Sequence, residues 1–291
     1  MPEPSFENLT VLALESRRAN EIAHLVANYG GQALVAPALR ELPLDNAGEV
    51  ETFLRELNGG GFDLLILLTG IGLRRLVEAA RGPFTETEIA SSLRRVRKLA
   101  RGPKPTAELR RLGLEPELQI AEPNTWREIL ATLDAAYPQG LAGIRVAVQE
   151  HGTPAEELLE GLKRRGAQPR VLRLYCYALP EDTAPLRAAL QALIADEIAV
   201  VLVTSSQQAA HLLQVAREAA VDEPVHAALR RAVIASIGPD TSRSLRELGL
   251  EPDLEASHPH MGFLVREAAA AAPGLRRKKN ASARLRDENS R

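Results

Sequence analysis

Six turns rich in glycine, serine and threonine follow short apolar runs of this sequence, and each opens a helical pattern. They lie at residues 16–18, 69–72, 102–106, 151–153, 204–206 and 238–242. Backbone N–H groups at a helix start can bind an anion, and the helix dipole adds about 0.3 to 1 kcal/mol per helix. Taken singly, each turn is best interpreted as a helix cap. If several converge at one edge of a sheet, they predict a site for a polyanion.

Two tyrosines stand two residues apart in the extended run RLYCYALP. Tyr175 and Tyr177 therefore share one face of that run, and Cys176 takes the other. A phenol, whose pKa is about 10, stays protonated at neutral pH and can donate a hydrogen bond to a leaving oxygen. Ordinary packing at the end of a strand is an equally good interpretation.

Other motifs give little support to metal or nucleotide chemistry. Residues 70–72, Gly-Ile-Gly, follow a strand pattern, but Arg75 stands where a dinucleotide fingerprint has its third glycine. His258 and His260 have no further His or Cys near them in sequence, so we interpret them as surface or capping residues. One cysteine forms neither an internal disulfide nor a zinc scaffold by itself. We predict no metal site.

The composition is that of an ordinary folded protein, with 45% hydrophobic and 25% charged residues. A net charge of −2 gives no general reason to expect nucleic acid or an anionic membrane as a partner. The N-terminus has no signal-peptide pattern, and the longest apolar runs fall far short of the roughly 20 residues that span a bilayer. We expect a cytoplasmic protein without membrane or nucleic-acid partners.

Short apolar runs alternate with helical patterns, which is typical of βα units on a parallel sheet. We expect ten strands, in two sheets of five. They are placed near residues 11–14, 33–36, 64–68, 96–99, 118–121, 146–149, 171–174, 200–203, 233–236 and 254–256. The helices are placed at residues 19–29, 50–57, 73–80, 107–112, 126–136, 155–165, 185–195, 207–219, 242–248 and 262–272.

The sequence also repeats itself. Residues 102–118, GPKPTAELRRLGLEPEL, match residues 238–254, GPDTSRSLRELGLEPDL, at ten of seventeen positions with an offset of 136. A repeat this long indicates a duplicated domain rather than an array of short repeats. The predicted fold class is therefore α/β, with two similar domains and a cleft between them.

The last segment, residues 273–291, has seven Lys or Arg, two acidic residues and no apolar periodicity. We expect a disordered basic tail there, because such charge runs are usually solvated. A basic arm that binds an anionic partner is the functional alternative.

Seven segments, in this order, resemble those of the uroporphyrinogen-III synthase family. They span about residues 9 to 272 and read SRRANEIAHLVANYGGQALVAPALRELP, TGIGLRRLVEA, ARGPKPTAELRRLGL, VAVQEHGTPAEELLEGLKRRGA, LYCYALPEDTAPL, VTSSQQAAHLL and IGPDTSRSLRELGL. The TGIG segment at 69–72 departs from the usual Thr-Ser-x-Asn-Gly of the family. The resemblance implies two flavodoxin-like domains, each a five-stranded parallel sheet flanked by helices, joined by a two-stranded extended linker. Domain 1 would contain residues 1–38 and 178–272, domain 2 residues 43–172, and the linkers residues 36–43 and 172–180.

The resemblance also implies a reaction. Hydroxymethylbilane, a linear tetrapyrrole with eight carboxylates, loses water and closes to uroporphyrinogen III with ring D inverted, which is a lyase reaction that needs no cofactor or metal. Its main demand is geometric, since the substrate must be held in one conformer away from water. Tyr175 matches the tyrosine that the family is thought to use, would lie on the hinge facing the cleft, and would donate to the departing hydroxyl.

The resemblance assigns further residues and partners. The substrate carboxylates would be held by Thr69, Gly70, Gly102, Thr204, Ser205, Ser206, Gly238 and Thr241, many of them through main-chain N–H groups. Arg17 and Arg18 are either a carboxylate clamp or a solvated helix start. We expect a monomer that binds hydroxymethylbilane and makes a transient contact with the deaminase that produces it. Two other classes stay open: a non-catalytic two-lobed α/β protein that binds a small anion, and a nucleotide-sugar transferase, which would need a longer chain.

Overall fold

The computed structural model describes residues 3–150, 152 and 154–289 of the chain. The chain divides into two compact units. Unit 1 consists of Met1–Arg40 and Ala178–Arg291, and unit 2 is the middle segment Glu41–Tyr177. Unit 1 is therefore built from both ends of the sequence.

A parallel five-stranded sheet forms the centre of unit 1. Its strands are β1 (Thr10–Ala13), β2 (Gln32–Val35), β10 (Val200–Val203), β11 (Val233–Ser236) and β12 (Leu254–Glu255), in the spatial order β12-β11-β10-β1-β2. Val11 lies opposite Val200 on one side and Ala33 on the other. Every residue of β10 and β11 is buried. Continuous apolar runs are expected of strands that are covered on both faces.

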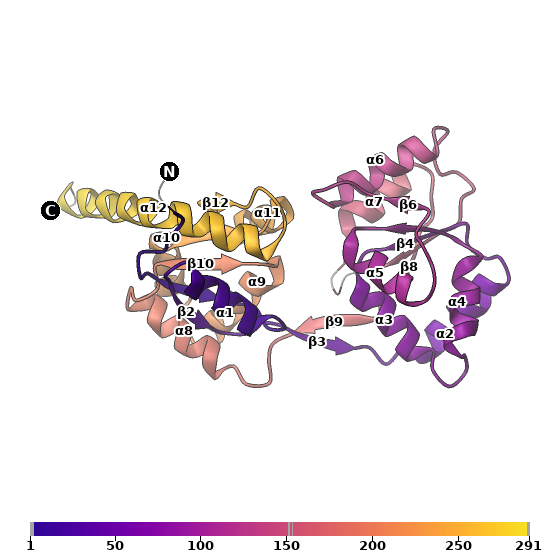
Figure 1. Ribbon diagram of the computed structural model, residues 1–291, viewed down its shortest axis with the longest axis horizontal. Helices are drawn as coiled ribbons and strands as arrows, with labels where there is room; N and C mark the ends of the chain where they lie inside the picture. Colours follow the sequence, from indigo (N-terminus) through magenta and orange to yellow (C-terminus); the bar gives the residue numbers. More distant parts are fainter. Residues whose placement is uncertain (1–2, 151, 153, 290–291) are drawn as a thin grey trace. The chain divides into compact units, whose positions relative to one another are not determined.

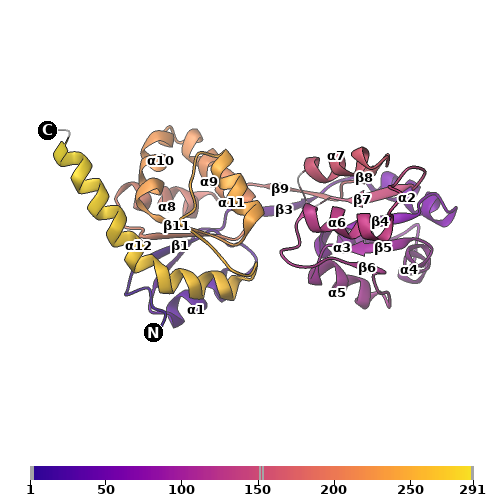
Figure 2. The ribbon, with the colours of Figure 1, turned by 90° about the horizontal axis from the view of Figure 1, so that it is seen from above.

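Helices cover both faces of this sheet (Figures 1 and 2). On one face, α1 (Ala19–Asn28) and α12 (Met261–Asn289) pack through an apolar cluster that includes Ile22, Val26 and Leu264. On the other face lie α8 (Ala184–Ile194), α9 (Ser206–Glu218), α10 (Asp222–Arg231) and α11 (Pro239–Glu247), with Leu190 and Leu212 in the cluster. The apolar positions of each helix fall on the face that meets the sheet.

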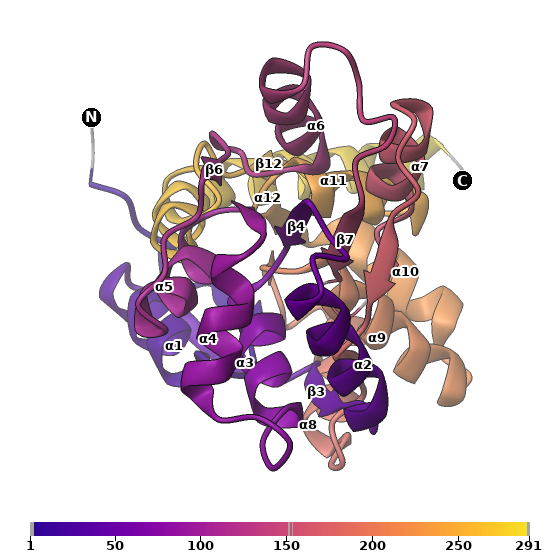
Figure 3. The same ribbon diagram turned by 90° about the vertical axis from the view of Figure 1, so that its right-hand side faces the viewer.

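Unit 2 repeats this architecture (Figure 3). Its parallel strands are β4 (Leu64–Leu67), β5 (Arg97–Ala100), β6 (Leu118–Gln119), β7 (Val146–Gln149) and β8 (Arg170–Leu172), in the order β6-β5-β4-β7-β8. One face carries α2 (Ala47–Asn58), α3 (Gly70–Ala79), α4 (Glu86–Arg94) and α5 (Pro103–Arg111). The other face carries α6 (Trp126–Ala136) and α7 (Glu156–Arg164).

The chain passes between the units twice, and the two passages pair with each other. β3 (Arg40–Pro43) and β9 (Tyr175–Ala178) form a separate two-stranded sheet. Next to it, the backbone N–H of Leu44 donates to the carbonyl of Leu174 at 3.2 Å. The predicted fold class, two parallel five-stranded sheets with an extended two-stranded linker, is confirmed.

The strand order agrees with the flavodoxin-like prediction in unit 1 and differs from it in unit 2. Numbered along the chain, the strands of unit 1 lie in the order 2-1-3-4-5, which is the flavodoxin order, and those of unit 2 lie in the order 3-2-1-4-5. The two sheets have the same spatial arrangement of strands, but the chain enters it at a different strand in each unit. Apolar runs predict where strands lie, but they carry no information about which strands become neighbours.

Two helices were missing from the prediction. In α4, Thr85 and Glu88 form a capping box, which is a signal present in the sequence. In α10, Asp222 and Glu223 lie in the first turn and Arg230 and Arg231 in the last, so the charges complement the helix dipole. Both helices are short, and each buries only a few apolar residues.

The expectation of a disordered tail from residue 273 is wrong, because α12 continues through Pro273 to Asn289. Arg276 is 7% exposed; it donates to the carbonyl of Arg231 at 2.6 Å and pairs with Asp196 at 2.8 Å. Lys279 pairs with Asp253 at 2.6 Å. Ion pairs from the basic residues to other elements hold this stretch of helix. The prediction relied on the absence of apolar periodicity and did not consider such pairs. Residues 290 and 291 lie outside the described residues.

Candidate functional site

All strands of each sheet are parallel, so their carboxyl ends meet at one edge, which is where ligands bind in sheets of this kind. In unit 1, this edge carries the starts of α1, α9 and α11. These starts bring together Arg17, Arg18, Thr204, Ser205, Ser206, Gly238 and Thr241. In unit 2, the edge carries the starts of α3 and α5 and the approach to β9, with Thr69, Gly70, Gly102 and Tyr175. The turn at 151–153 was also predicted, but His151 and Thr153 lie outside the described residues.

Thr204 is held within unit 1 by two side chains that sequence reasoning missed. Its hydroxyl donates to Glu15 Oε2 at 2.6 Å, and its backbone N–H donates to Gln208 Oε1 at 2.9 Å. Gln208, 2% exposed, returns a bond from Nε2 to the Thr204 hydroxyl at 2.8 Å. Both donors of Thr204 are thus used inside the protein, so Thr204 shapes the turn.

Ser205 and Ser206 are the residues of this turn that face outward. Ser205 is the N-cap of α9 with an extended backbone, yet its side chain makes no capping hydrogen bond. Both serines are partly exposed. The first N–H groups of a helix have no partner within the helix, so an uncapped start can donate them to an outside acceptor.

The turn at Gly238 is closed by buried serines. Ser236 Oγ accepts from the N–H of Gly238 at 3.3 Å and donates to the Gly238 carbonyl at 3.0 Å. Ser242 Oγ lies 2.9 Å from Ser236 Oγ, and neither serine is exposed. Gly238 was predicted to hold a carboxylate of the substrate through its N–H. In the structure that N–H is bonded to Ser236 Oγ. Thr241 lies one turn further on and is 7% exposed.

Arg18 forms the N-cap of α1, and its guanidinium pairs with Glu21 one turn later. This pairing lowers the pKa of Glu21 below its usual range. About half of each side chain is exposed. Arg17 is exposed as well. Both arginines lie at the predicted edge of the sheet, and Arg18 is already engaged with a carboxylate of its own helix.

In unit 2, Tyr175 is the largest side chain without exposed surface. It packs in an apolar cluster with Leu172 and Leu174, and the ring of Tyr177 stands against it edge to face at 5.6 Å. The sequence placed this phenol facing a cleft, whereas the structure encloses it. Burial raises the pKa of Tyr175 well above the ordinary value for tyrosine, and Tyr177 adds to this effect. The phenol is therefore protonated at any physiological pH.

The hydroxyl of Tyr175 interacts with the side chains of Tyr177 and Thr69. It lies 3.2 Å from Thr69 Oγ1, and Thr69 also caps α3 by accepting from the N–H of Gly72 at 3.0 Å. The Thr69 backbone N–H donates to Gln149 Oε1 at 3.2 Å. Tyr175 is thus tied to the start of α3, which is one of the predicted turns.

An ion pair between the half-exposed Arg173 and the buried Glu150 holds the segment that leads to Tyr175. Glu150 is 1% exposed, and its Oε2 lies 3.0 Å from Nε and Nη2 of Arg173. Its other oxygen accepts from the backbone N–H of Ala155 at 3.0 Å. Asn46 donates to the carbonyl of Arg173 at 2.5 Å. Side-on arginine–carboxylate pairs fix geometry as well as charge, so the approach to β9 is held at two points.

Glycines at this edge serve close packing more than ligand approach. A Cβ at Gly70 would lie 2.7 Å from the carbonyl oxygen of Lys104, because α3 and α5 begin side by side. Gly102 has φ 137°, a conformation that only glycine adopts readily, and its turn is closed by Thr106 Oγ1 donating to its carbonyl at 2.9 Å. The side chain of Asn124 lies close to it.

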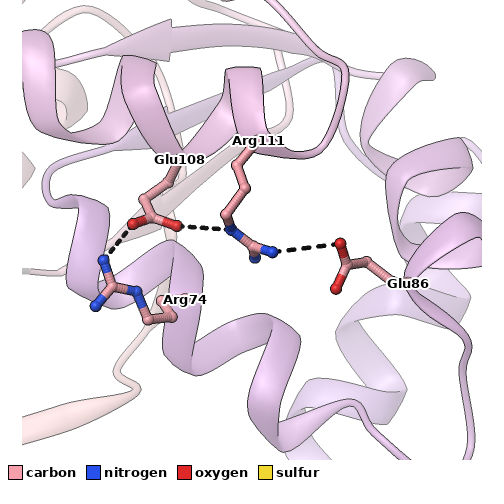
Figure 4. A network of polar contacts seen from close by, with 4 residues as sticks. All are labelled: Arg74, Glu86, Glu108 and Arg111. Atoms are coloured by element: carbon pink, nitrogen blue, oxygen red, sulfur yellow. Dashed lines mark hydrogen bonds and ion pairs between the residues drawn. The ribbon is translucent and has the colours of Figure 1, made fainter.

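A chain of charges ties together the helices on the same face of unit 2 (Figure 4). Glu108 of α5 pairs with Arg74 of α3 and, at 3.1 Å, with Arg111 of its own helix. Arg111 reaches Glu86 of α4 at 3.3 Å. Burial alone would raise the pKa of Glu108, but its two arginines lower it overall. The network stiffens the helices whose starts form the edge.

Within the part of the chain that the structure describes, no three His, Cys, Asp or Glu side chains are grouped so that they could hold a metal ion. His258 and His260 stack near Phe263, with ring centroids at 4.6 and 6.3 Å. None of the described helices is both long and apolar enough to cross a membrane.

Comparison with protein families gives a match over most of the chain. The model described as "Uroporphyrinogen-III synthase HemD" matches residues 20–266. The chain belongs to the uroporphyrinogen-III synthase family. The predicted resemblance is thereby confirmed.

Individual relatives of the family are distant. The uncharacterized protein YjjA of Bacillus subtilis is 29% identical over 255 residues, covering 87% of this chain and 92% of its own. A putative uroporphyrinogen-III synthase of Methanothermobacter thermautotrophicus is 28% identical over 242 residues, covering 80% and 87%.

Two solved structures are also similar. A mutant uroporphyrinogen III synthase from Thermus thermophilus matches with a TM-score of 0.65 and 25% identity, over 89% of this chain and 96% of that one. The uroporphyrinogen-III synthetase of Helicobacter pylori has a TM-score of 0.53 and 17% identity, over 89% and 98%, and shares the fold.

Proposed function

We propose that this chain is a uroporphyrinogen-III synthase, a lyase that cyclises hydroxymethylbilane to uroporphyrinogen III with inversion of ring D and loss of water. This activity would place it in porphyrin and haem biosynthesis. Family membership supports the reaction class. The observation that carries the proposal is a tyrosine hydroxyl, that of Tyr175, tied to Thr69 at the edge of the sheet where α3 and α5 begin.

In this mechanism Tyr175 is a hydrogen-bond donor to the departing hydroxyl of ring A. Its raised pKa excludes a role as a base, since the phenolate is not populated near neutral pH. The pyrrole nitrogen supplies the electrons that expel the hydroxyl, so a neutral donor is sufficient help. Because Tyr175 is fully buried, substrate binding has to uncover its hydroxyl.

Carboxylates of the substrate are held by helix starts in our proposal. Three helices, α5, α9 and α11, begin without a side-chain capping bond. Main-chain N–H groups of these first turns, together with the hydroxyls of Ser205 and Ser206, supply donors for anions. Most of these N–H groups belong to α9, because α5 begins with Pro103 and Pro105 and α11 with Pro239, and proline has no N–H. Thr204 and Gly238 act indirectly, because their own donors are bound to Glu15, Gln208 and Ser236.

A second candidate is a non-catalytic protein that binds a small anion. One observation favours it: Tyr175 has no exposed surface. Such a protein would bind hydroxymethylbilane or another carboxylate without changing the isomer that forms.

The test supplies purified protein with hydroxymethylbilane, made in place by the deaminase, and separates the type I and type III uroporphyrins after oxidation. Type III product supports the proposal. Type I alone, together with measurable binding of hydroxymethylbilane, would establish the second candidate.

Tyr175→Phe tests the role of the tyrosine. We expect it to lower the rate of type III formation about 100-fold, which is the ordinary contribution of one general acid. Tyr137→Phe is the matched control, because Tyr137 lies in the same unit, at the end of α6 under the guanidinium of Arg97. Equal turnover by both folded variants would remove Tyr175 from the mechanism.

A further inference from the structure

The side chain of Gln149, at the end of β7, is completely buried. It fills the space that Gly72 leaves open in the first turn of α3. A Cβ on residue 72 would lie 1.8 Å from Gln149 Nε2, far inside van der Waals contact. The amide is therefore held in a niche that is shaped by the absence of a side chain.

Backbone groups determine which way the amide of Gln149 points. Its Oε1 accepts from the N–H of Thr69 at 3.2 Å, and its Nε2 donates to the carbonyl of Glu150. An N–H can only donate and a carbonyl can only accept. A flipped amide would face both groups with the wrong atom, so this assignment follows from chemistry rather than from atom labels.

The fixed amide determines where the proton of Thr69 goes. Thr69 Oγ1 accepts from the N–H of Gly72 at 3.0 Å and from Gln149 Nε2 at 3.4 Å. A hydroxyl has two acceptor lone pairs and one proton, and both lone pairs are now used. Its proton is left for its remaining neighbour, the oxygen of Tyr175 at 3.2 Å.

We propose that Gln149 is a positioning residue that makes Thr69 the donor to Tyr175 and so turns the phenolic proton of Tyr175 away from Thr69, to the side where the substrate can displace Tyr177 and accept it. The last step rests on the proposed function. Without the amide, Tyr175 could donate to Thr69 instead, and its proton would point away from the substrate. The hydrogen bond from Thr69 also favours partial negative charge on the phenol oxygen as the proton shifts toward the leaving group.

Unit 1 contains the same arrangement of a glutamine and a threonine, and there the direction of the threonine hydrogen bond is unambiguous. The amide of Gln208 accepts from the N–H of Thr204 at 2.9 Å and donates to its hydroxyl at 2.8 Å, as the amide of Gln149 does with Thr69. The neighbour that receives the Thr204 proton is the carboxylate of Glu15, at 2.6 Å. An ionised carboxylate can only accept. Thr204, whose N–H and hydroxyl both bond a glutamine amide, therefore donates its hydroxyl proton to a third residue, as we infer for Thr69.

The test compares Gln149→Glu with Gln149→Met. The glutamate variant keeps an acceptor for the Thr69 N–H but, when ionised, has no N–H to give. The hydroxyl of Thr69 then turns to the new carboxylate, and Tyr175 must donate to Thr69. The methionine variant has a side chain of similar volume but loses the amide bonds to both the N–H and the hydroxyl of Thr69. It replaces Gln149→Glu in the test if the buried carboxylate prevents folding.

Two readouts are needed. The first is the ¹³Cζ resonance of Tyr175, assigned by its loss in Tyr175→Phe; we expect it to move in both Gln149 variants, because the phenol changes from an acceptor to a donor in its hydrogen bond with Thr69. The second is type III formation, where we expect kcat to fall about tenfold to 100-fold while KM stays within about twofold. Gln208→Glu is the matched control, and it should leave the Tyr175 resonance in place.

The outcomes separate the two proposals. A resonance that stays in place in both folded variants overturns the inference, as does wild-type turnover by Gln149→Glu. If Gln149 were merely structural, Gln149→Glu would retain more activity than Gln149→Met, because it keeps the bond from Thr69. If the wild type makes no type III product, the proposed function fails, and the resonance alone decides the polarity.

Discussion

Replacing Gly72 with alanine tests the niche on which the Tyr175 site depends. The added Cβ would lie 1.8 Å from Nε2 and 2.1 Å from Cδ of Gln149, whereas ordinary contacts begin near 3.4 Å. The amide is buried and flat, so it has to leave its place. It then loses its bonds to the N–H of Thr69 and the carbonyl of Glu150.

The expected cost can be worked out from these contacts. Each buried polar group left without a partner costs about 1 to 3 kcal/mol, and two are stranded. Alanine returns up to about 1 kcal/mol through its better helix propensity. We expect the free energy of unfolding of unit 2 to fall by about 1 to 6 kcal/mol, with a central value of about 3 kcal/mol.

Trp126 provides the assay, because it is the single tryptophan of the chain and lies in α6 of unit 2. Its fluorescence during urea unfolding reports this unit without interference from unit 1. With a urea dependence of about 2 kcal/mol per M, the central value lowers the midpoint by about 1.5 M. Gly48→Ala is the matched control: Gly48 lies in α2 of the same unit, a Cβ added there would have no neighbour within 4 Å, and the midpoint of this variant should hold or rise slightly.

A double substitution sharpens the test. Gly72→Ala together with Gln149→Ala removes the clash, so the double variant should lose at least about 1 kcal/mol less than the sum of the single losses. If Gly72→Ala and Gly48→Ala unfold at the same urea concentration, the niche does not constrain Gln149 and the reasoning is refuted.

Two further predictions concern the repeated turn and a buried charge. Gly102→Ala should destabilise unit 2 by about 1 to 2 kcal/mol, because φ is 137° and Asn124 lies 3.2 Å from the added Cβ; Gly238→Ala, with φ 166° and its nearest neighbour at 3.8 Å, should stay within about 0.5 kcal/mol by calorimetry. Burial raises the pKa of Glu117, but the ion pair with Lys98, which is 2% exposed, lowers this pKa below its usual value overall. Ionised Glu117 therefore stabilises the fold above its unfolded pKa of about 4.3, and this stabilisation is lost as the pH falls through the folded pKa. Glu117→Gln should therefore lower the free energy of unfolding, measured by urea at pH 7, by about 1 to 2 kcal/mol. The difference between the variant and the wild type should shrink below about pH 4. A difference that is the same at both pH values would contradict this account.

Strand positions were predictable because the sheets are buried on both faces. Runs such as VVLV at β10 and VIAS at β11 are almost wholly apolar, and they have no other place in a folded protein. The repeated turn predicted two similar units for the same reason, since Gly102 and Gly238 each begin a helix after a buried strand.

The polar partners at the site could not be predicted from the sequence. Thr204 was visible as a turn residue, but Glu15, which accepts its hydrogen bond, lies near the other end of the chain. Gln149 likewise meets Thr69 only because β7 and β4 are neighbours. These contacts depend on which strands are neighbours in the sheet, and local sequence patterns do not predict strand order.

The last helix was misjudged for a related reason. Arg276 and Lys279 looked like solvated charges, because their partners Asp196 and Asp253 belong to other elements. A charge run predicts disorder only when nothing nearby can pair with it.

The discontinuous sheet of unit 1 has a consequence for synthesis of the protein. β1 is a central strand, and its partner Val200 for Val11 is translated 189 residues later. At about 5 to 20 residues per second, the wait on the ribosome is about 10 to 40 s. Unit 2 is complete at Tyr177 and can fold during that time, while the apolar β1 strand stays without its neighbour. Nascent chains of this protein therefore carry β1 as an exposed aggregation-prone strand until β10 has been translated, and chaperones that bind such strands should be retained there for that time.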